Sequence, residues 1–357
     1  MRRRHGALRT ALRAHAHQRP RQRRDAPCGR GIRGGAHRGT RPRRAHSHDR
    51  HPRVNAREWL ARDTPAPPDV ALFGAPISKA SISPSEAWST PPALRAALTR
   101  FPTWDAEHRI DLEQLALRDL GDVEGDRDDT DASAAHRRIE DEAARAGSLA
   151  AVTVIVGGDN SLTAPAMRGL MRGRPDDGWG LLTIDAHHDC RPLDDGPRNG
   201  TPVRELIEGG LAGNRVAQLG INAFGNAAEH ARWAAEHGIH VYTADWVHST
   251  GMAATVHDAL ATLSEAGVSS LYVDVDVDSA DRAFAPACPA SLPGGLRPDE
   301  LALAAHLLGR DPRVTAADLT EVDANADLAG ITVRLAAALF LAFCSGVAAR
   351  PRPLRRA

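Results

Sequence analysis

Carboxylates alternate with valines in the run "LYVDVDVDSAD" (271–281), which is typical of a β-strand with acids on one face. Side chains alternate between the two faces of a strand, so Asp274, Asp276 and Asp278 would lie together. Unpaired carboxylates repel one another and are costly to bury. Two divalent metal ions would supply about four positive charges to balance them and could activate a bridging water.

A second run, "DAHHD" (185–189), has the residue types of a metal site. Asp185, His187 and Asp189 share one parity, so an extended segment would project all three to the same side. Two carboxylates and an imidazole suit a borderline divalent cation such as Mn²⁺. His188 would point the other way, and we expect it to be packed or to support a ligand.

Two more apolar runs end in residues of the ligand type. "TVIVGGDNS" ends in Asp159 and Asn160, and "AADLTEVD" ends in Glu321. Each has a simpler explanation in isolation, because Gly and Asn favour turns and a single Asp often caps a helix. Their common position after apolar runs is what makes them candidates.

The elements that must position these residues alternate along the chain. Strands are predicted at 69–76, 151–158, 180–187, 215–221, 239–244, 270–278 and 314–322. Helices are predicted within 132–146, 227–237, 253–266 and 298–308. This alternation favours an α/β fold with a parallel sheet covered on both faces. Ligands of such sheets bind at the carboxyl ends of the strands, where the candidate residues lie.

The first 53 residues differ in composition from the rest. They contain seventeen arginines and only two acids, a charge of about +15, so the remainder carries about −15. With few large apolar residues, such a segment cannot offset its ordering entropy. We therefore expect residues 1–55 to be a disordered Arg-rich tail, or a stretch translated from a misassigned start, and 56–357 to be one domain. A nucleic-acid-binding arm is the alternative, although no aromatic residues are interleaved to stack on bases.

Cysteine usage and hydropathy point to the cytoplasm. The four cysteines form no close pair, so we expect no disulfide framework. No apolar segment of the signal-peptide type occurs near the N-terminus. The apolar stretch 335–349 is short for a membrane span, and we interpret it as a buried terminal helix.

Three motifs together resemble one family. "GGDNS", "DAHHD" and "DVDSADRAFAPACPASLPGGL" are similar to those of the ureohydrolases, which include arginases, agmatinases and formimidoylglutamases, over roughly residues 70–345. The resemblance implies a three-layer α/β/α arginase-like fold with a mainly parallel sheet. It also implies manganese-dependent hydrolysis of a guanidino or formimino C–N bond, and assembly as a homo-oligomer.

The resemblance further implies a ligand set for two Mn²⁺ ions. The first ion would be held by Asn160, Asp185, Asp189 and Asp276, and the second by His187, Asp185, Asp276 and Asp278. Asp274 is not expected to bind metal; pairing with an Arg is favoured, and a supporting acceptor role is the alternative. Asn160 stands where the family usually has His, although some formimidoylglutamases carry Asn there. A weaker first metal, or a metal-poor protein, is therefore an open alternative.

The loops favour one branch of this family. "RPLDDGPRNGTPVREL" and "LGINAFGNAAEHARW" resemble loops of formimidoylglutamases. Their substrate has two carboxylates, so cationic anchors are expected. The candidate substrate-binding residues are Arg191, Arg198, Asn199, Asn222 and Glu321. Glu321 matches the family's acceptor for the cationic C–N group, and Asp189 or Asp281 could transfer a proton to the leaving nitrogen.

The implied reaction begins when a hydroxide bridging the two metals attacks the formimino carbon. The products would be L-glutamate and formamide, in histidine breakdown. Two alternatives stay open: an agmatinase or other amidinohydrolase that releases urea, and a non-catalytic binding protein with a degraded metal site. We expect a small-molecule substrate, and neither nucleic acid nor membrane as a partner.

Overall fold

The computed structural model describes residues 54–62, 67–174, 178–352 and 354. The predicted tail, 1–55, lies outside the described residues except for its last two positions. Asn55 caps the first helix, α1 (Ala56–Leu60), because its side chain accepts a hydrogen bond from the Glu58 backbone N–H. The described part therefore begins with a well-formed helix start at the predicted domain boundary.

Eight strands form one sheet in the order β4-β1-β5-β10-β9-β6-β7-β8, and all of its pairs are parallel. The strands are β1 (Val70–Ala75), β4 (Leu117–Asp122), β5 (Val152–Gly157), β6 (Trp179–Ile184), β7 (Val216–Ile221), β8 (His240–Thr243), β9 (Ser270–Asp276) and β10 (Val314–Thr320). A separate antiparallel hairpin pairs β2 (Trp104–Asp105) with β3 (Ile110–Asp111). All seven predicted strands are confirmed, and β4 was not predicted.

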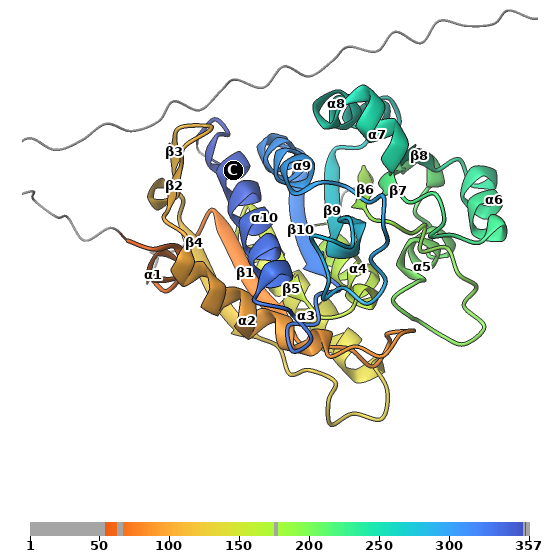
Figure 1. Cartoon of the computed structure of the whole chain (residues 1–357), viewed down its shortest axis with the longest axis horizontal. Helices are drawn as coiled ribbons and strands as arrows, with labels where there is room; N and C mark the ends of the chain where they lie inside the picture. The colour runs from red at the N-terminus through yellow and green to blue at the C-terminus, as the bar shows by residue number, and fades with distance from the viewer. Residues whose placement is uncertain (1–53, 63–66, 175–177, 353, 355–357) are drawn as a thin grey trace, which may run out of the picture. The chain divides into compact units, whose positions relative to one another are not determined.

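Helices cover both faces of the sheet, which confirms the three-layer α/β/α prediction (Figure 1). One face packs against α2 (Thr90–Ala97), α8 (Met252–Glu265), α9 (Pro298–Arg310) and α10 (Ile331–Ala348). The other face packs against α3 (Ser133–Leu149), α4 (Thr163–Gly173), α5 (Pro202–Glu208) and α6 (Ala228–Glu236). The remaining helix is α7 (Ala244–Thr250), and the 3₁₀ turns are η1 (Ala87–Ser89), η2 (Leu98–Arg100), η3 (Leu112–Gln114), η4 (Asn160–Leu162), η5 (Gly213–Arg215) and η6 (Val277–Ser279).

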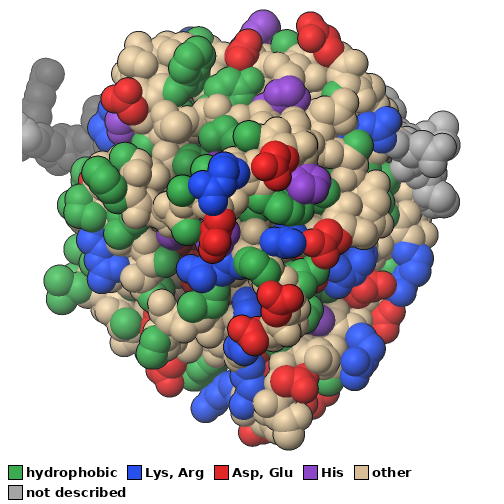
Figure 2. Space-filling model, turned by 90° about the vertical axis from the view of Figure 1, so that its right-hand side faces the viewer, with side chains coloured by type: hydrophobic (Ala, Val, Ile, Leu, Met, Phe, Trp, Pro, Cys, Tyr) green, Lys and Arg blue, Asp and Glu red, His purple; other side chains and the backbone are tan. Residues whose placement is uncertain are grey.

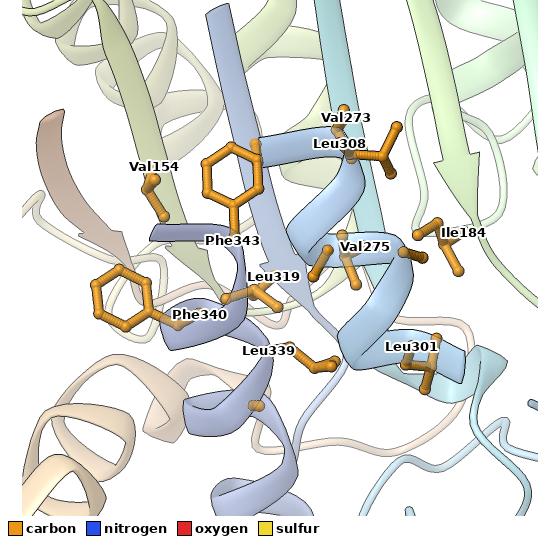
Figure 3. Close-up of a cluster of buried hydrophobic side chains, with 14 of the residues drawn as sticks. Val154, Ile184, Val273, Val275, Leu301, Leu308, Leu319, Leu339, Phe340 and Phe343 are labelled. Carbon is orange, nitrogen blue, oxygen red and sulfur yellow. The ribbon is translucent and has the colours of Figure 1, made fainter. Parts of the chain in front are cut away.

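The alternation in β9 decides where its carboxylates go. Val273 and Val275 point into the apolar core beneath α9 and α10, beside Leu308 (Figure 3). Residues of the opposite parity, such as Tyr272, belong to the core on the other face. Asp274 and Asp276 therefore share the face away from α9 and α10, as the sequence pattern predicts.

The C-terminal apolar stretch forms α10, a core helix of this domain. By length and composition it could cross a membrane, but 72% of its apolar window is buried inside the structure. It packs closely on α9, because a Cβ at Gly346 would lie 2.1 Å from the carbonyl oxygen of His306. The helix is therefore explained by packing within the domain, as predicted for 335–349.

Candidate active site

The four motif-bearing strands are neighbours in the sheet, in the order β5-β10-β9-β6. Because these strands are parallel, their carboxyl ends meet at one edge. Asn160 follows β5, Glu321 follows β10, Asp276 ends β9 and Asp185 follows β6. The structure thus brings together four motifs that are up to 160 residues apart in the chain.

One ligand cluster is formed by Asp185, His187 and Asp278. Nδ1 of His187 lies 3.4 Å from Oδ1 of Asp185 and 3.1 Å from Oδ2 of Asp278. One ligand atom from each of the three lies within 4.8 Å of the others. Oδ2 of Asp185 is buried and has no hydrogen-bond partner among the described residues. An orphaned carboxylate oxygen beside an imidazole fits a bound divalent cation.

The second cluster surrounds Asn160. Its Nδ2 donates to Oδ2 of Asp189 at 2.7 Å, and its Oδ1 accepts from the hydroxyls of Thr163 and Thr320 at 2.9 and 3.1 Å. To bind a cation, Asn160 would need its amide oxygen, and not Nδ2, directed toward the carboxylate of Asp189. A half-turn of the amide would place it there, and the two hydroxyls can accept from Nδ2 as readily as they donate to Oδ1.

Asp274 corrects one expectation. It is fully buried and lies in register with Asp318 of β10, without an Arg partner among the described residues. Burial raises its pKa well above the usual value, and the charges of Asp318 and Asp185 raise it further. Its Oδ2 lies 3.5 Å from Nδ2 of Asn160, and its carboxylate belongs to a ligand group with those of Asp185 and Asp189. The predicted Arg pairing is wrong, because the surroundings of this residue are acidic.

Two site residues adopt unusual backbone conformations. Asp189 has φ 52° and Glu321 has φ 67°, in the left-handed region that residues with side chains rarely occupy. Oε1 of Glu321 accepts from the backbone N–H of Asn160 at 2.7 Å and from Nδ2 of Asn199 at 3.0 Å. Strained residues held by such contacts concentrate at functional sites. These conformations aim both carboxylates at the same space.

A cavity of about 220 Å³ opens above these residues. Its walls include seven of the predicted site residues: His187, Asp189, Arg191, Asn199, Asp276, Asp278 and Glu321. Arg198 lies instead in a neighbouring cavity of about 420 Å³, which Arg191 also lines. Neither arginine forms an ion pair with a described residue, so both remain available to an anionic ligand.

The structure does not bring Asn222 and Asp281 into this cavity. Asn222 donates to the carbonyl oxygen of Pro293 and accepts from the Phe224 backbone, while both carboxylate oxygens of Asp281 accept backbone N–H groups. These contacts hold loops in place, and neither residue is in the lining of this cavity, so the roles in substrate binding and proton transfer stay predictions. Sequence reasoning missed Asn226 and His230, which do line the cavity. Both residues lie in the loop "LGINAFGNAAEHARW", from which the sequence analysis selected only Asn222.

The electrostatics of the site favour a cation. Burial raises the pKa of Asp185 to about 6, with a further contribution from the charge of Asp278. Burial and the charge of Asp278 also raise the pKa of Asp276 well above its usual value. Burial alone would lower the pKa of His187, but the charge of Asp278 and hydrogen bonds to Asp185 and Asp278 raise it to about 12. In the metal-free fold, protons on these groups therefore reduce the repulsion that a bound metal ion would otherwise relieve.

Comparison with known proteins gives the family. The model of the arginase family matches residues 68–345. A formimidoylglutamase of Halalkalibacterium halodurans is 38% identical over 279 residues, which cover 77% of this chain and 86% of that protein.

Solved structures agree with this similarity. The formimidoylglutamase of Bacillus subtilis superposes with a TM-score of 0.79 at 31% identity, covering 86% of this chain and 96% of that one. Trypanosoma cruzi formiminoglutamase with Mn²⁺ superposes with a TM-score of 0.75 at 26% identity, covering 84% of this chain and 99% of that one. The chain described here therefore belongs to the arginase family and is a hydrolase of amidine C–N bonds.

Proposed function

We propose that this hydrolase is a manganese-dependent formimidoylglutamase of the cytoplasm, which converts N-formimino-L-glutamate to L-glutamate and formamide. The observation that carries the proposal is a cavity lined by carboxylates and an imidazole, with two arginines at and beside its rim that form no ion pair with a described residue. Relatives named for this activity support the same substrate. We also expect a homo-oligomer.

The donor set suits two Mn²⁺ ions, since it combines several carboxylate oxygens with one amide and one imidazole. Asn160, Asp185, Asp189 and Asp276 would hold the first ion, and His187, Asp185, Asp276 and Asp278 the second. Bound metals would supply a hydroxide near neutral pH and Lewis acidity. Oδ2 of Asp185, which is buried without a hydrogen-bond partner among the described residues, supports a bound cation most directly.

Substrate recognition would depend on charge at both ends of the cavity. The α-nitrogen of formiminoglutamate bears the formimino group, so the substrate offers two carboxylates and no free amine. Arg191 would bind one carboxylate and Arg198 the other, through paired N–H donors. Glu321 would accept hydrogen bonds from the cationic formimino group. Asp189 lines the cavity and would transfer the proton to the leaving nitrogen.

The first test is formamide release from N-formimino-L-glutamate by the purified protein, with and without added Mn²⁺. Agmatine and arginine are assayed for urea in parallel. Manganese-dependent formamide release supports the proposal. Urea from agmatine or arginine moves the substrate to another amidinohydrolase. No turnover of the three compounds, with less than one metal bound per chain, would leave a binding protein with a degraded site.

Removing the guanidinium group of Arg191 should weaken substrate binding more than it slows turnover. We expect Arg191→Ala to raise KM about 10- to 100-fold, the effect of losing one charge-assisted hydrogen-bonded contact, with kcat changed by less than about 3-fold. Steady-state kinetics with formiminoglutamate measure both constants. Arg204→Ala is the matched control, because Arg204 pairs with Glu208 outside the cavity. An unchanged KM in Arg191→Ala would refute this anchor.

Replacing the weak ligand should tighten the first metal site. Asn160→His exchanges an amide, which donates weakly, for an imidazole that ligates divalent metals more strongly. After dialysis at limiting Mn²⁺, we expect the variant to retain more metal than the wild-type chain, approaching two ions. Circular dichroism controls for the larger side chain, since Asn160 is fully buried. Equal metal content in two folded proteins would contradict the assignment of Asn160.

Stabilisation by metal should increase with pH. The carboxylate pKa values of the metal-free fold are raised, so the contribution of these groups to its stability is fully present below about pH 4. That contribution is lost as pH rises through about 6, the pKa of Asp185. Metal binding must displace these protons, so the same rise in pH favours the metal. We expect Mn²⁺ to raise Tm strongly at pH 8 and little at pH 5.5, by thermal unfolding with and without Mn²⁺. Equal shifts at both values would show that these groups are not the ligands.

A further inference from the structure

A second group of metal-ligating side chains lies outside the active site. One ligand atom from each of Asp105, His108 and His306 lies within 4.8 Å of the others. Asp105 ends β2, His108 lies in the turn before β3, and His306 belongs to the last turns of α9. Since α9 ends just before β10 begins, this group lies at the amino-terminal edge of the sheet, opposite the candidate active site. Figure 1 shows β2 and β3 beside the C-terminal end of α10.

The hydrogen bonds in this group leave nitrogen atoms available. Nδ1 of His108 lies 2.9 Å from Oδ2 of Asp105, which orients the ring and leaves Nε2 for another partner. His306 is only 4% exposed, and its Nδ1 is buried without a hydrogen-bond partner among the described residues. Buried ring nitrogens normally have a partner, so an orphaned Nδ1 needs an explanation.

The two buried or partly buried side chains of this group have shifted pKa values. Burial, with a contribution from the neighbouring His108, lowers the pKa of His306 to about 4. Burial would raise the pKa of Asp105, but hydrogen bonds from Ser345 and His108 lower it to about 2. One carboxylate and two imidazoles meet at this point.

We propose that Asp105, His108 and His306 bind a transition metal of the Zn²⁺ type, independently of the active site. Two imidazoles and one carboxylate are a common donor set for Zn²⁺, whereas the oxygen-rich active site suits Mn²⁺. Three protein ligands leave a fourth position toward the cavity of about 470 Å³ that Asp105 and His108 line.

The imidazole rings must rearrange for this ion to bind. They are stacked, with centroids 3.4 Å apart and planes 8° from parallel. Two parallel rings cannot both direct their in-plane lone pairs at one ion between them. Binding therefore requires the exposed His108 ring to leave the stack, with a change in its 2.9 Å contact to Asp105, while His306 is the buried partner. The bound metal would tie the hairpin to α9, and Ser345 already ties Asp105 to α10 through a 2.5 Å hydrogen bond.

The test counts two metals in one protein. The Mn²⁺-loaded chain is dialysed against micromolar ZnCl₂, and Zn and Mn are measured by elemental mass spectrometry. We expect about one Zn²⁺ gained per chain, no Mn²⁺ released, and a higher Tm because the ligand binds only the folded state. Absence of Zn²⁺ uptake, or uptake matched by Mn²⁺ release, would overturn the proposal.

Variants locate the bound Zn²⁺. His108→Ala alters an exposed side chain and His306→Gln removes the buried ligand, and both should lose the additional Zn²⁺ while retaining Mn²⁺ and turnover. His257→Ala, at an exposed position of α8, should keep it. If His306→Gln is poorly folded, His108→Ala alone decides. Zn²⁺ uptake unchanged in a folded His108→Ala protein would place the ion elsewhere and refute the site.

Discussion

Asp276→Asn is expected to abolish formamide release and to lower the metal content below one ion per chain. This carboxylate lines the cavity and is assigned to both metal ions, so its loss affects two sites at once. Loss of a group that merely supports a metal ligand typically costs about 10- to 100-fold in affinity or activity, and we expect a larger effect here. Metal content by elemental analysis and formamide release measure the two consequences separately.

Asp274→Asn is the matched control, two residues earlier on the same face of β9. Asp274 does not line the cavity, and burial together with the charges of Asp318 and Asp185 raises its pKa well above the usual value. The pKa of Asp276 is raised in the same way, so protonation does not separate the two residues. Asp274 lies outside the cavity lining and is assigned to neither metal ion, although its carboxylate lies close to those of Asp185 and Asp189, so we expect two metals and an activity within about 3-fold of the wild type. If Asp274→Asn loses metal while Asp276→Asn keeps it, the ligand on this strand is Asp274, two residues before the assigned position.

The sequence was sufficient for the central sheet because its strands are buried on both faces. Near-continuous apolar runs such as 152–157 cannot be mistaken for surface segments, and the polar residues that follow them mark the carboxyl edge. β4 escaped prediction because only half of it looks like a strand. Its Asp119 and Asp122 are neutralised by Arg95 of α2, at 2.7 and 2.5 Å, and that partner is 24 to 27 residues away in the chain.

The structure brings the predicted ligands together through a local geometry that differs from the expected one. The extended run was expected to continue to residue 187, but β6 ends at Ile184. The His187 backbone N–H donates to Oδ1 of Asp185 at 2.7 Å, which turns the chain, and the left-handed conformation of Asp189 brings that side chain back. Residue types and their order placed these side chains in one candidate group, whereas their convergence depends on a turn that strand parity does not describe.

The hydrogen-bond partners and neighbours of individual polar side chains were the least predictable feature of the site. Asn222 and Asp281 have the right chemistry for substrate or proton transfer, yet backbone groups of their own loops already occupy their polar atoms. Asp274 likewise appeared to need an Arg, and the fold instead places Asp318 beside it. Such competition between loop backbone and substrate is decided by three-dimensional packing, which one sequence does not contain.

Glu321→Gln is expected to lower kcat/KM for formiminoglutamate about 10²- to 10³-fold, with unchanged metal content. The Gln carbonyl can still accept from the Asn160 backbone and from Asn199, so the strained turn keeps its contacts. What is lost is the negative charge facing the cationic formimino group, a contribution comparable to removal of one preorganised transition-state contact.

The pH dependence of kcat/KM distinguishes two roles of Glu321, the contact of its charge with the substrate and the support of the turn. Burial raises the pKa of Glu321 to about 8, and the charge of Asp159 contributes. The side chain is therefore mostly protonated at neutral pH until a cation binds beside it. The cationic substrate should favour the ionised form, so wild-type kcat/KM should rise with pH toward 8, and the Gln variant should lack this rise. Asn199→Ala leaves the charge but removes a hydrogen bond that lowers the pKa of Glu321, so its kcat/KM should still rise with pH, with the rise displaced to higher pH. A Gln variant with wild-type kcat/KM and full metal content would mean that Glu321 supports the turn and does not contact the substrate.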